Sequence, residues 1–320
     1  MANELFIPTT MTANGDLLLS TTIANYRNQL VDNIYNDVPV FRLLNQAGRK
    51  RTESGGVSIV ETLVHKKQAD GGFYLGRDTL STTQGDNVLQ VEYRWQNAYE
   101  PIQITMDDEL DNGSSTEKLI DLAGTRMQLA EMGLKDRMGQ ALVASVASAN
   151  NLIPLSTLVG TGTLGTIAGG TDTFWQSTVT TSGAFATQGL TDMQTLYSTL
   201  SSSSMMDTPT HIITTRTVWN KFYQTRLPLE RLMNTETGKA GFNNITFNGV
   251  PVIWDQYCDS GILYMCNTNY WNLVVHSKMD FVTTEFVRPS NQMAKVAFIL
   301  WRGNQTTNNR RRFGKLVSIT

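Results

Sequence analysis

The chain has 320 residues, enough for two domains or one large one, and only 17% of them are charged, with a formal net charge of −2. A net charge near zero excludes a global electrostatic signal for nucleic acid. The two cysteines, Cys258 and Cys266, are too few for a disulfide framework. No run reaches the roughly 18 apolar residues of a membrane span, and no signal peptide is recognisable, so we expect a protein made in the cytoplasm.

The first 50 residues are predicted to form an arm. Residues 1–20 show little periodicity, and residues 21–35 are predicted to form a short helix that ends before Pro39, because the residue preceding a proline is pushed out of helical geometry. One face of that helix carries Ile23, Tyr26, Leu30 and Ile34. A second short helix, VFRLLNQAG, is closed by Gly48. An amphipathic segment on a flexible lead typically docks on a partner.

Two strands with an unusually long connection come next. Alternating apolar and polar residues predict strands over 57–65 and 88–105. The loop between them is far longer than a hairpin loop of about two to five residues, and such a two-stranded excursion has too little core to be stable alone. We therefore expect it to lie on another subunit; the alternative is an active-site lid. Candidate contact residues of the loop are Lys66, Lys67, Phe73, Tyr74, Arg77 and Asp78.

A long helix is predicted over 114–150. An apolar stripe at helical period runs along it, formed by Leu119, Ala123, Met127, Ala130, Leu134, Met138 and Ala141. Ser114 and Glu117 have the spacing of a capping box. Gly124, Gly133 and Gly139 lie on other faces, where they would let a neighbouring backbone approach closely. Such a helix typically lies across a sheet or forms a coiled coil; an ordinary long helix of an all-α enzyme is the alternative.

The rest of the chain alternates between helices and strands, which indicates a mixed α/β domain. Residues 155–186 are predicted to form loops and short strands. Helices are predicted over 188–201 and 216–226, and strands over 211–214, 250–254, 261–265, 281–287, 293–302 and 312–319. The last two strands are joined by a polar tip, GNQTTNNR, and we expect the final strands to pack against the long helix.

Sites for chemistry are weakly indicated. Residues 160–165, GTGTLG, match the dinucleotide-binding fingerprint, but the sequence that follows cannot form the helix that holds the pyrophosphate. His65, His211 and His276 have no metal-type spacing, and no cofactor is expected. An acid cluster precedes the long helix, where carboxylates complement the helix dipole; its members are Asp107, Asp108, Glu109 and Asp111. A soluble hydrolase or lyase would need a convergent polar pocket, and no candidate set of residues is evident.

Two local basic runs stand out, at residues 49–51 and at Arg310, Arg311 and Arg312. A solvated surface is the first interpretation. Contacts with a partner carboxylate or with a packaged nucleic-acid backbone are the second, which makes these three arginines further candidates for contacts between subunits.

The order of these pieces resembles the major capsid proteins of tailed double-stranded DNA bacteriophages, which have the Hong Kong 97-type fold. The stretches VDNIYNDVPVFRLL, THIITTRTVWNKFYQ and FNGVPVIWDQYCDSGILYMCNTNYWNL are also similar to that family. The resemblance covers nearly the whole chain and implies an α+β fold. The implied parts are an amino-terminal arm (1–50), an extended β-hairpin loop (51–105), a peripheral domain with the spine helix (106–150 and 281–320) and an axial α/β domain (151–280).

The resemblance implies a structural protein, not an enzyme. Members assemble as pentamers and hexamers into an icosahedral head around double-stranded DNA, so the implied location is the virion. The implied partners are copies of the chain, a scaffolding protein, a portal, non-specifically bound DNA and a decoration protein, with no membrane. No scaffolding extension precedes the arm, which resembles members with a separate scaffolding protein, or a mature form. No motif identifies a cross-linking partner for the loop lysines. An encapsulin-like nanocompartment shell is the alternative of the same fold.

Overall fold

The computed structural model describes residues 38–66, 72–80, 85–111, 116–143, 150–201, 207–230 and 245–320. The predicted arm and helix before residue 38 lie outside these ranges. Contacts divide the chain into two compact units, each assembled from separate segments. The first comprises Met1–Gly55, Gln96–Leu142 and Val275–Gly303, and the second Gly56–Trp95, Val143–Val274 and Asn304–Thr320.

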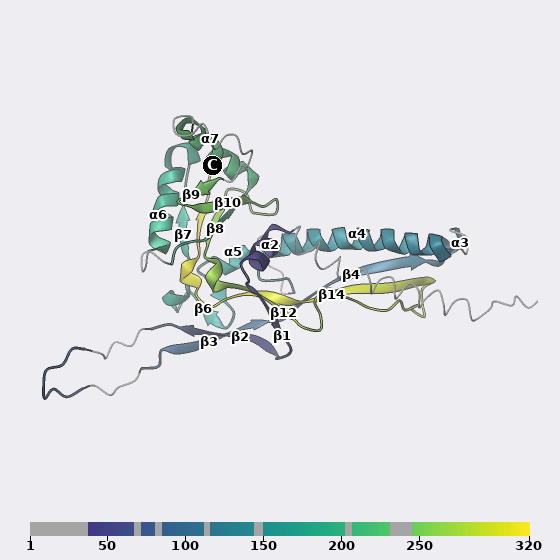
Figure 1. Ribbon diagram of the computed structural model, residues 1–320, viewed down its shortest axis with the longest axis horizontal. Helices are drawn as coiled ribbons and strands as arrows, with labels where there is room; N and C mark the ends of the chain where they lie inside the picture. Colours follow the sequence, from purple (N-terminus) through teal and green to yellow (C-terminus); the bar gives the residue numbers. More distant parts are fainter. Residues whose placement is uncertain are drawn as a thin grey trace, which may run out of the picture. The chain divides into compact units, whose positions relative to one another are not determined.

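The first unit is organised around one long antiparallel strand pair and one long helix. Its elements are α2 (Pro39–Gln46), β1 (Lys50–Glu53), β4 (Gln96–Thr105), α3 (Met106–Asp111), α4 (Thr116–Val143), β13 (Val282–Thr283) and most of β14 (Ala294–Thr307). β4 pairs with β14 from Thr105↔Ala294 to Gln96↔Gly303. Helix α4 runs along this pair (Figure 1), and its Arg137 forms an ion pair with Glu100 of β4 at 3.3 Å. The prediction of a long helix lying across a sheet is confirmed.

The apolar stripe of α4 is buried as predicted. Its buried members are Ala123, Met127, Ala130, Leu134 and Met138, and Ala141 is half-buried. The predicted cap Ser114 and the side chain of Leu119 lie outside the described part. The predicted last residue, Asn150, lies in a turn, so the helical end at 150 is wrong. Among the described residues, no backbone from outside the helix comes close to Gly124 or Gly133: nothing lies within 4 Å of a Cβ at the first, and the second meets the Glu100 side chain.

The second unit contains the mixed α/β domain. Its elements are β2 (Ser58–Val64), β3 (Val88–Arg94), α5 (Leu155–Leu158), β5 (Thr163–Leu164), β6 (Ile167–Ala168), η1 (Thr173–Trp175), β7 (Thr178–Thr181), η2 (Phe185–Gly189), α6 (Leu190–Leu200), β8 (His211–Thr214), α7 (Arg216–Glu230), β9 (Thr246–Phe247), β10 (Val250–Trp254), β11 (Leu263–Cys266), η4 (Thr268–Tyr270), β12 (Trp271–His276, whose last two residues belong to the first unit), η5 (Arg310–Arg312) and β15 (Gly314–Val317). A six-stranded sheet has the order β7-β15-β11-β8-β10-β9. Its β8–β10 and β7–β15 pairs are parallel and its other pairs antiparallel.

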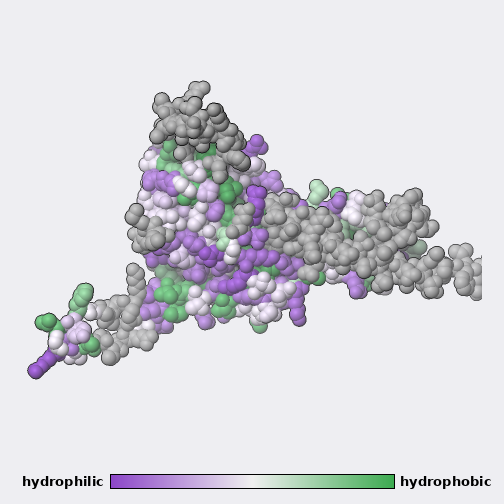
Figure 2. Space-filling model, viewed as in Figure 1, coloured by the Kyte–Doolittle hydropathy of each residue, from purple (hydrophilic) through white to green (hydrophobic). Residues whose placement is uncertain are grey.

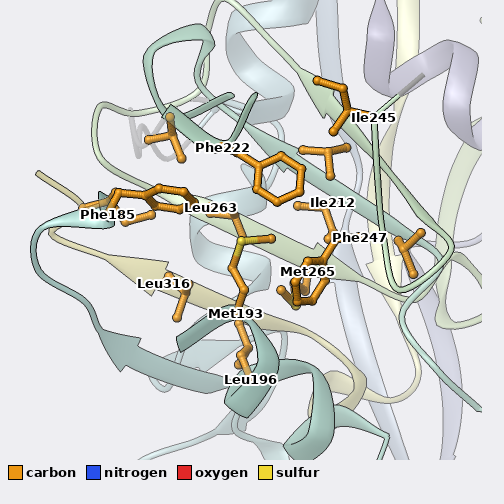
Figure 3. Close-up of a cluster of buried hydrophobic side chains, with 14 of the residues drawn as sticks. Phe185, Met193, Leu196, Ile212, Phe222, Ile245, Phe247, Leu263, Met265 and Leu316 are labelled. Atoms are coloured by element: carbon orange, nitrogen blue, oxygen red, sulfur yellow. The ribbon is translucent and has the colours of Figure 1, made fainter. Parts of the chain in front are cut away.

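An apolar core joins one face of this sheet to α6 and α7 (Figure 3). Ile212, Met265 and Leu316 come from three neighbouring strands, and Met193 and Phe222 come from the two helices. Burial of these side chains holds the helices on the sheet. The predicted alternation of helices and strands is confirmed here, although α7 runs to Glu230, beyond the predicted end at residue 226.

Several predicted strands differ in extent. The strand expected over 88–105 is two strands, β3 and β4, interrupted at Trp95, because the two halves pair with different partners: β3 with β2, and β4 with β14. The strand over 281–287 shrinks to β13 and an isolated bridge between Val287 and Val296. The strand β12 was not predicted.

The polar tip GNQTTNNR is the largest error in the predicted fold. Gly303 to Thr307 continue strand β14, and all five residues are buried. The next strand, β15, pairs with β7 and β11 in the six-stranded sheet. The last two strands therefore do not form one closing sheet: β14 pairs with β4, and β15 belongs to the six-stranded sheet.

Candidate functional site

The β2–β3 ribbon carries the long loop. The two strands pair antiparallel from Ser58↔Arg94 to Val64↔Val88, and the His65 amide extends the ladder by donating to the Asn87 carbonyl at 3.1 Å. Residues alternate between a buried and an exposed face, as a period of two requires. The ribbon is thus a two-stranded support with one face turned to solvent.

The described tip of the loop, residues 72–80, presents apolar side chains to solvent. Phe73, Tyr74, Leu75 and Leu80 are exposed, and green hydrophobic atoms are visible at this tip, at the left of Figure 2. A tight turn shapes it: the Leu75 amide donates to the Asp78 carboxylate at 2.9 Å, and the Asp78 amide donates to the Leu75 carbonyl at 3.3 Å. Exposed apolar side chains grouped in this way are typical of surfaces that bind a partner.

Four of the six predicted contact residues of the loop lie together in its described tip. Phe73, Tyr74, Arg77 and Asp78 all lie exposed in the tip, and Lys66 is exposed where the loop begins. Lys67 lies outside the described residues. Asp78 has an additional role within the chain, because its carboxylate closes the turn.

The base of the ribbon, which we call the root, has its own core within the chain. Ile59, Leu63 and Val91 pack in one cluster with Leu164 and Trp175; the cluster also includes Tyr93, Trp95, Ile167 and Val274. The excursion was expected to need another surface, that of another subunit; the root does lie on another surface, but it is one of its own chain.

Polar contacts add to the root. Thr306 donates its hydroxyl to Glu61 at 2.8 Å, and the Tyr93 hydroxyl donates to the Thr307 carbonyl at 2.7 Å. Asn304 donates its amide to the Arg94 carbonyl at 2.8 Å. Burial is the largest cause that raises the pKa of Tyr93, so it remains a neutral donor. These polar contacts were not predicted, although the sequence indicates them: Glu61 is an acid at a position that the period of two places on the same inward face as Ile59 and Leu63.

The solvated interpretation of the basic run is wrong for Arg310. This side chain is 1% exposed, and its guanidinium donates to four backbone carbonyls, those of Thr157, Leu158, Gly162 and Trp175. Burial lowers the pKa of Arg310 to about 10, which leaves it charged at neutral pH. Arg310 therefore organises its own chain and is not available to a neighbouring subunit.

The other two arginines of the run differ from Arg310 and from each other. Arg312 is half-buried; it donates to the Leu200 carbonyl and forms an ion pair with Asp207 at 2.9 Å. Arg311 is exposed, so it is the member of the run that fits the original interpretation.

The glycine-rich match at 160–165 lies in a short hairpin. The strand β5 lies within the match and β6 follows it in place of a helix, so the amide groups of a helix N-terminus do not stand where a pyrophosphate would need them. Gly165 instead fits closely against β3: a Cβ there would lie 2.5 Å from the Val91 side chain. The glycine serves packing of the ribbon.

The remaining chemical candidates have structural explanations. Asp107 and Asp108 lie within α3, a short helix that precedes α4, as predicted for the acid cluster. Bonds from Thr105, followed by Arg126, lower the pKa of Asp108. Cys258 and Cys266 are buried and unbonded to each other, and burial raises the pKa of both thiols, which disfavours a nucleophilic thiolate.

Among the described residues, no three His, Cys, Asp or Glu side chains are grouped so that they could hold a metal ion. Within the same ranges, no helix combines the length and the apolar character needed to cross a bilayer.

Comparisons with known proteins identify the fold. No family model matches the chain, and no curated protein sequence matches it. Among solved structures, the capsid asymmetric unit of cyanophage A-1(L) is similar over 88% of this chain and 93% of that chain, with a TM-score of 0.63 and 14% identity. The capsid of the native GTA particle is similar over 87% and 90%, with a TM-score of 0.58 and 11% identity.

A cellular shell has a comparable likeness. The holo-SrpI encapsulin complex from Synechococcus elongatus PCC 7942 is similar over 87% of this chain and 86% of that chain, with a TM-score of 0.54 and 12% identity. The common feature of these structures is a shell-forming chain of mixed helix and sheet. The protein described here therefore has the fold of phage major capsid proteins, the Hong Kong 97-type fold that the sequence resemblance implied.

Proposed function

We propose that the protein is the structural subunit of an icosahedral phage head, assembling through pentamers and hexamers around double-stranded DNA. The observation that carries this proposal is the shared fold over nearly the full length of both this chain and the phage capsid chains. The exposed apolar tip of the loop supports it, because such a tip is unfavourable on a protein that remains a monomer.

Within this proposal, residues 1–50 are the arm, 51–105 the extended loop, 106–150 and 281–320 the peripheral domain, and 151–280 the axial domain. Residues 314–317 are an exception, because β15 pairs with β7 and β11 of the axial segment. Further proposed partners are a scaffolding protein, a portal and a decoration protein, and the proposed sites are the host cytoplasm for assembly and the virion.

The loop is the proposed contact between subunits. Phe73, Tyr74 and Arg77 would lie on a neighbouring copy, with Lys66 and Arg311 as polar contacts at other exposed points. Many weak contacts repeated by symmetry produce a strong shell while each single step stays reversible. Deleting residues 71–85 should leave soluble capsomers or monomers, and normal shells formed by that deletion variant would contradict the loop's role.

Negative-stain electron microscopy with mass determination tests the proposal as a whole. The protein is expressed alone and together with the products of its neighbouring reading frames. Closed shells, or rings of five and six subunits, are expected. A compact monomer under every condition would contradict the proposal and return attention to an enzyme.

A nanocompartment shell is the second candidate, favoured by the similarity to the encapsulin complex. The contents of purified shells distinguish the two functions: DNA is expected in the phage head and an enclosed enzyme in the nanocompartment. If DNA is bound, the near-zero net charge predicts sequence-independent, salt-sensitive binding. A preferred sequence in a competition binding assay would contradict that expectation.

A further inference from the structure

The root of the ribbon contains a buried acid on a face that is otherwise apolar. Glu61 lies between Ile59 and Leu63 in the alternation of β2 and is 5% exposed. Replacing a buried charged group by an apolar one of similar size is often neutral or stabilising. A gain in stability therefore does not explain why an acid occupies this position. The directional hydrogen bonds that its carboxylate can accept offer another explanation.

Its partners come from the buried end of β14, which also reaches the second strand of the ribbon. Thr306 bonds Glu61 of β2 at 2.8 Å. The neighbouring Thr307 engages Tyr93 of β3 twice, accepting from its hydroxyl at 2.7 Å and donating its amide to the same oxygen at 3.4 Å. We call these five residues the polar latch; they are Glu61, Tyr93, Asn304, Thr306 and Thr307, with Asn304 bonding the Arg94 carbonyl.

A second contact holds the root from the turn between β5 and β6. The Glu92 amide donates to the Thr166 hydroxyl at 3.2 Å. Beside it, Gly165 lies so close to the ribbon that an added Cβ would be 2.7 Å from the Glu92 carbonyl oxygen. The segment leading into this turn is fixed by Arg310, which bonds Gly162 and Leu158.

We infer that the polar latch is a positioning device that fixes the tilt of the β2–β3 ribbon, and through it the place of the loop tip. Apolar contacts of the root are non-directional and tolerate a change of angle. Hydrogen bonds weaken steeply as their angle departs from linearity, so bonds to both strands restrict rotation of the ribbon. The consequence for assembly rests on the proposed function; the fixed tilt does not.

The tilt is tested first by a distance measurement on the full chain. Spin labels are placed at Thr62→Cys on the exposed face of the ribbon and at Thr187→Cys on η2, both exposed positions of the second unit. Cys258 and Cys266 are buried and should not react. One narrow distance distribution is expected with the latch intact, and a broad one with Thr306→Val and Tyr93→Phe together. A narrow distribution in the double variant overturns the inference.

Three further variants distinguish a specific loss of the ribbon's fixed tilt from a general loss of stability. Glu61→Gln, in the otherwise unchanged protein, keeps an oxygen acceptor for Thr306 and should leave the distribution narrow. Ile212→Val removes a methyl group from the other core, away from the latch, and should stay narrow; if it broadens equally, the inference fails. Thr306→Val alone provides the same test in a nearly isosteric form if the double variant does not fold.

Electron microscopy of the same variants tests the consequence. Uniform particles are expected from the unlabelled wild type, Glu61→Gln and Ile212→Val, and particles of mixed size from the double variant. Uniform particles from the double variant would overturn the role in assembly. If the wild type forms no particles, the proposed function fails, and the distance measurement still decides whether the latch fixes the tilt.

Discussion

Two regions of the second unit, the core of the six-stranded sheet and the root of the ribbon, are stabilised by different kinds of interaction. The core between the six-stranded sheet and its helices is apolar: Ile212, Phe222 and Met265 are each 2% exposed or less. The root of the ribbon combines an apolar cluster with Glu61 and Arg310, both buried and both bonded within the chain. The first region buries apolar side chains, whereas the second also contains hydrogen bonds that restrict the direction of the ribbon.

The apolar core mainly stabilises the fold, whereas the root of the ribbon also has to hold the ribbon at one angle. Apolar burial stabilises by roughly 25 cal/mol per Å² whatever the angle of approach. A projecting ribbon acts as a lever, so a small rotation at its root moves its tip far. Directional bonds belong at such a root, and the following substitutions test whether the two regions respond as this distinction requires.

Phe222→Ala should have the largest effect. The ring is 1% exposed and packs edge-on against Phe185 and Phe247, so its removal should lower the free energy of unfolding by about 3–5 kcal/mol. Urea denaturation measures the change. Gln224→Ala on the exposed face of the same helix is the control, with an expected change within about 0.5 kcal/mol. Similar values for the two variants would contradict the assigned core.

Arg310→Leu should destabilise by about 3 kcal/mol, because it leaves the buried carbonyls of Leu158 and Trp175 without this donor. The matched control is the adjacent Arg311→Leu, an exposed position with an expected change within about 0.5 kcal/mol. The same urea titration measures both. Equal effects would show that Arg310 acts as a surface charge after all.

Gly165→Ala should destabilise by about 1–3 kcal/mol. This glycine has φ +63°, and an added Cβ would collide with Val91 of the ribbon. Gly162→Ala is the control, because its Cβ would meet open space. Thermal unfolding of both variants is sufficient for the comparison; an unchanged Gly165→Ala protein would mean that the turn does not press against the ribbon.

Asp255→Asn should have the smallest effect, a gain in stability at neutral pH. Asp255 is 1% exposed, and burial raises the pKa of its carboxyl above the ordinary value, while its bond from the Tyr257 amide opposes the rise. The folded state thus binds the proton more tightly, so wild-type stability is full below the unfolded pKa and falls as pH rises through the folded pKa.

The advantage of Asp255→Asn should accordingly vanish in acid and grow as pH rises. Asparagine keeps an acceptor for the Tyr257 amide and removes the buried charge. Unfolding titrations at several pH values measure the difference, and a constant difference across the series would exclude titration of Asp255 as its cause.

The sequence predicted those elements whose burial follows from local period. The stripe from Ala123 to Met138 on α4 and the alternation of β2 are both confirmed. A 3.6-residue or 2-residue period is a property of the chain itself and can be read without a partner. The loop tip was also found by its length and composition, although only its described residues, 72–80, can be placed.

Local periodicity does not predict which strands pair with each other or which residues bond a buried polar side chain. The continuous alternation through Trp95 gave no sign that β3 pairs with β2 while β4 pairs with β14. Asn304 to Thr307 were assigned to an exposed tip because polar residues usually favour solvent. Residues distant in the sequence satisfy their hydrogen bonds in the folded chain: Arg94 bonds Asn304, Trp271 bonds Gln305, Glu61 bonds Thr306 and Tyr93 bonds Thr307.

Local periodicity in the sequence was therefore enough to predict the spine helix and the strands of the ribbon, and the length of the connection predicted the loop, whereas the α+β fold class was implied by the family resemblance. Only the tertiary structure decided that Arg310 is buried, that β15 joins the six-stranded sheet, and that the root of the ribbon carries polar bonds. A buried polar group is stable only when its partners surround it, and those partners come together only when the chain has folded.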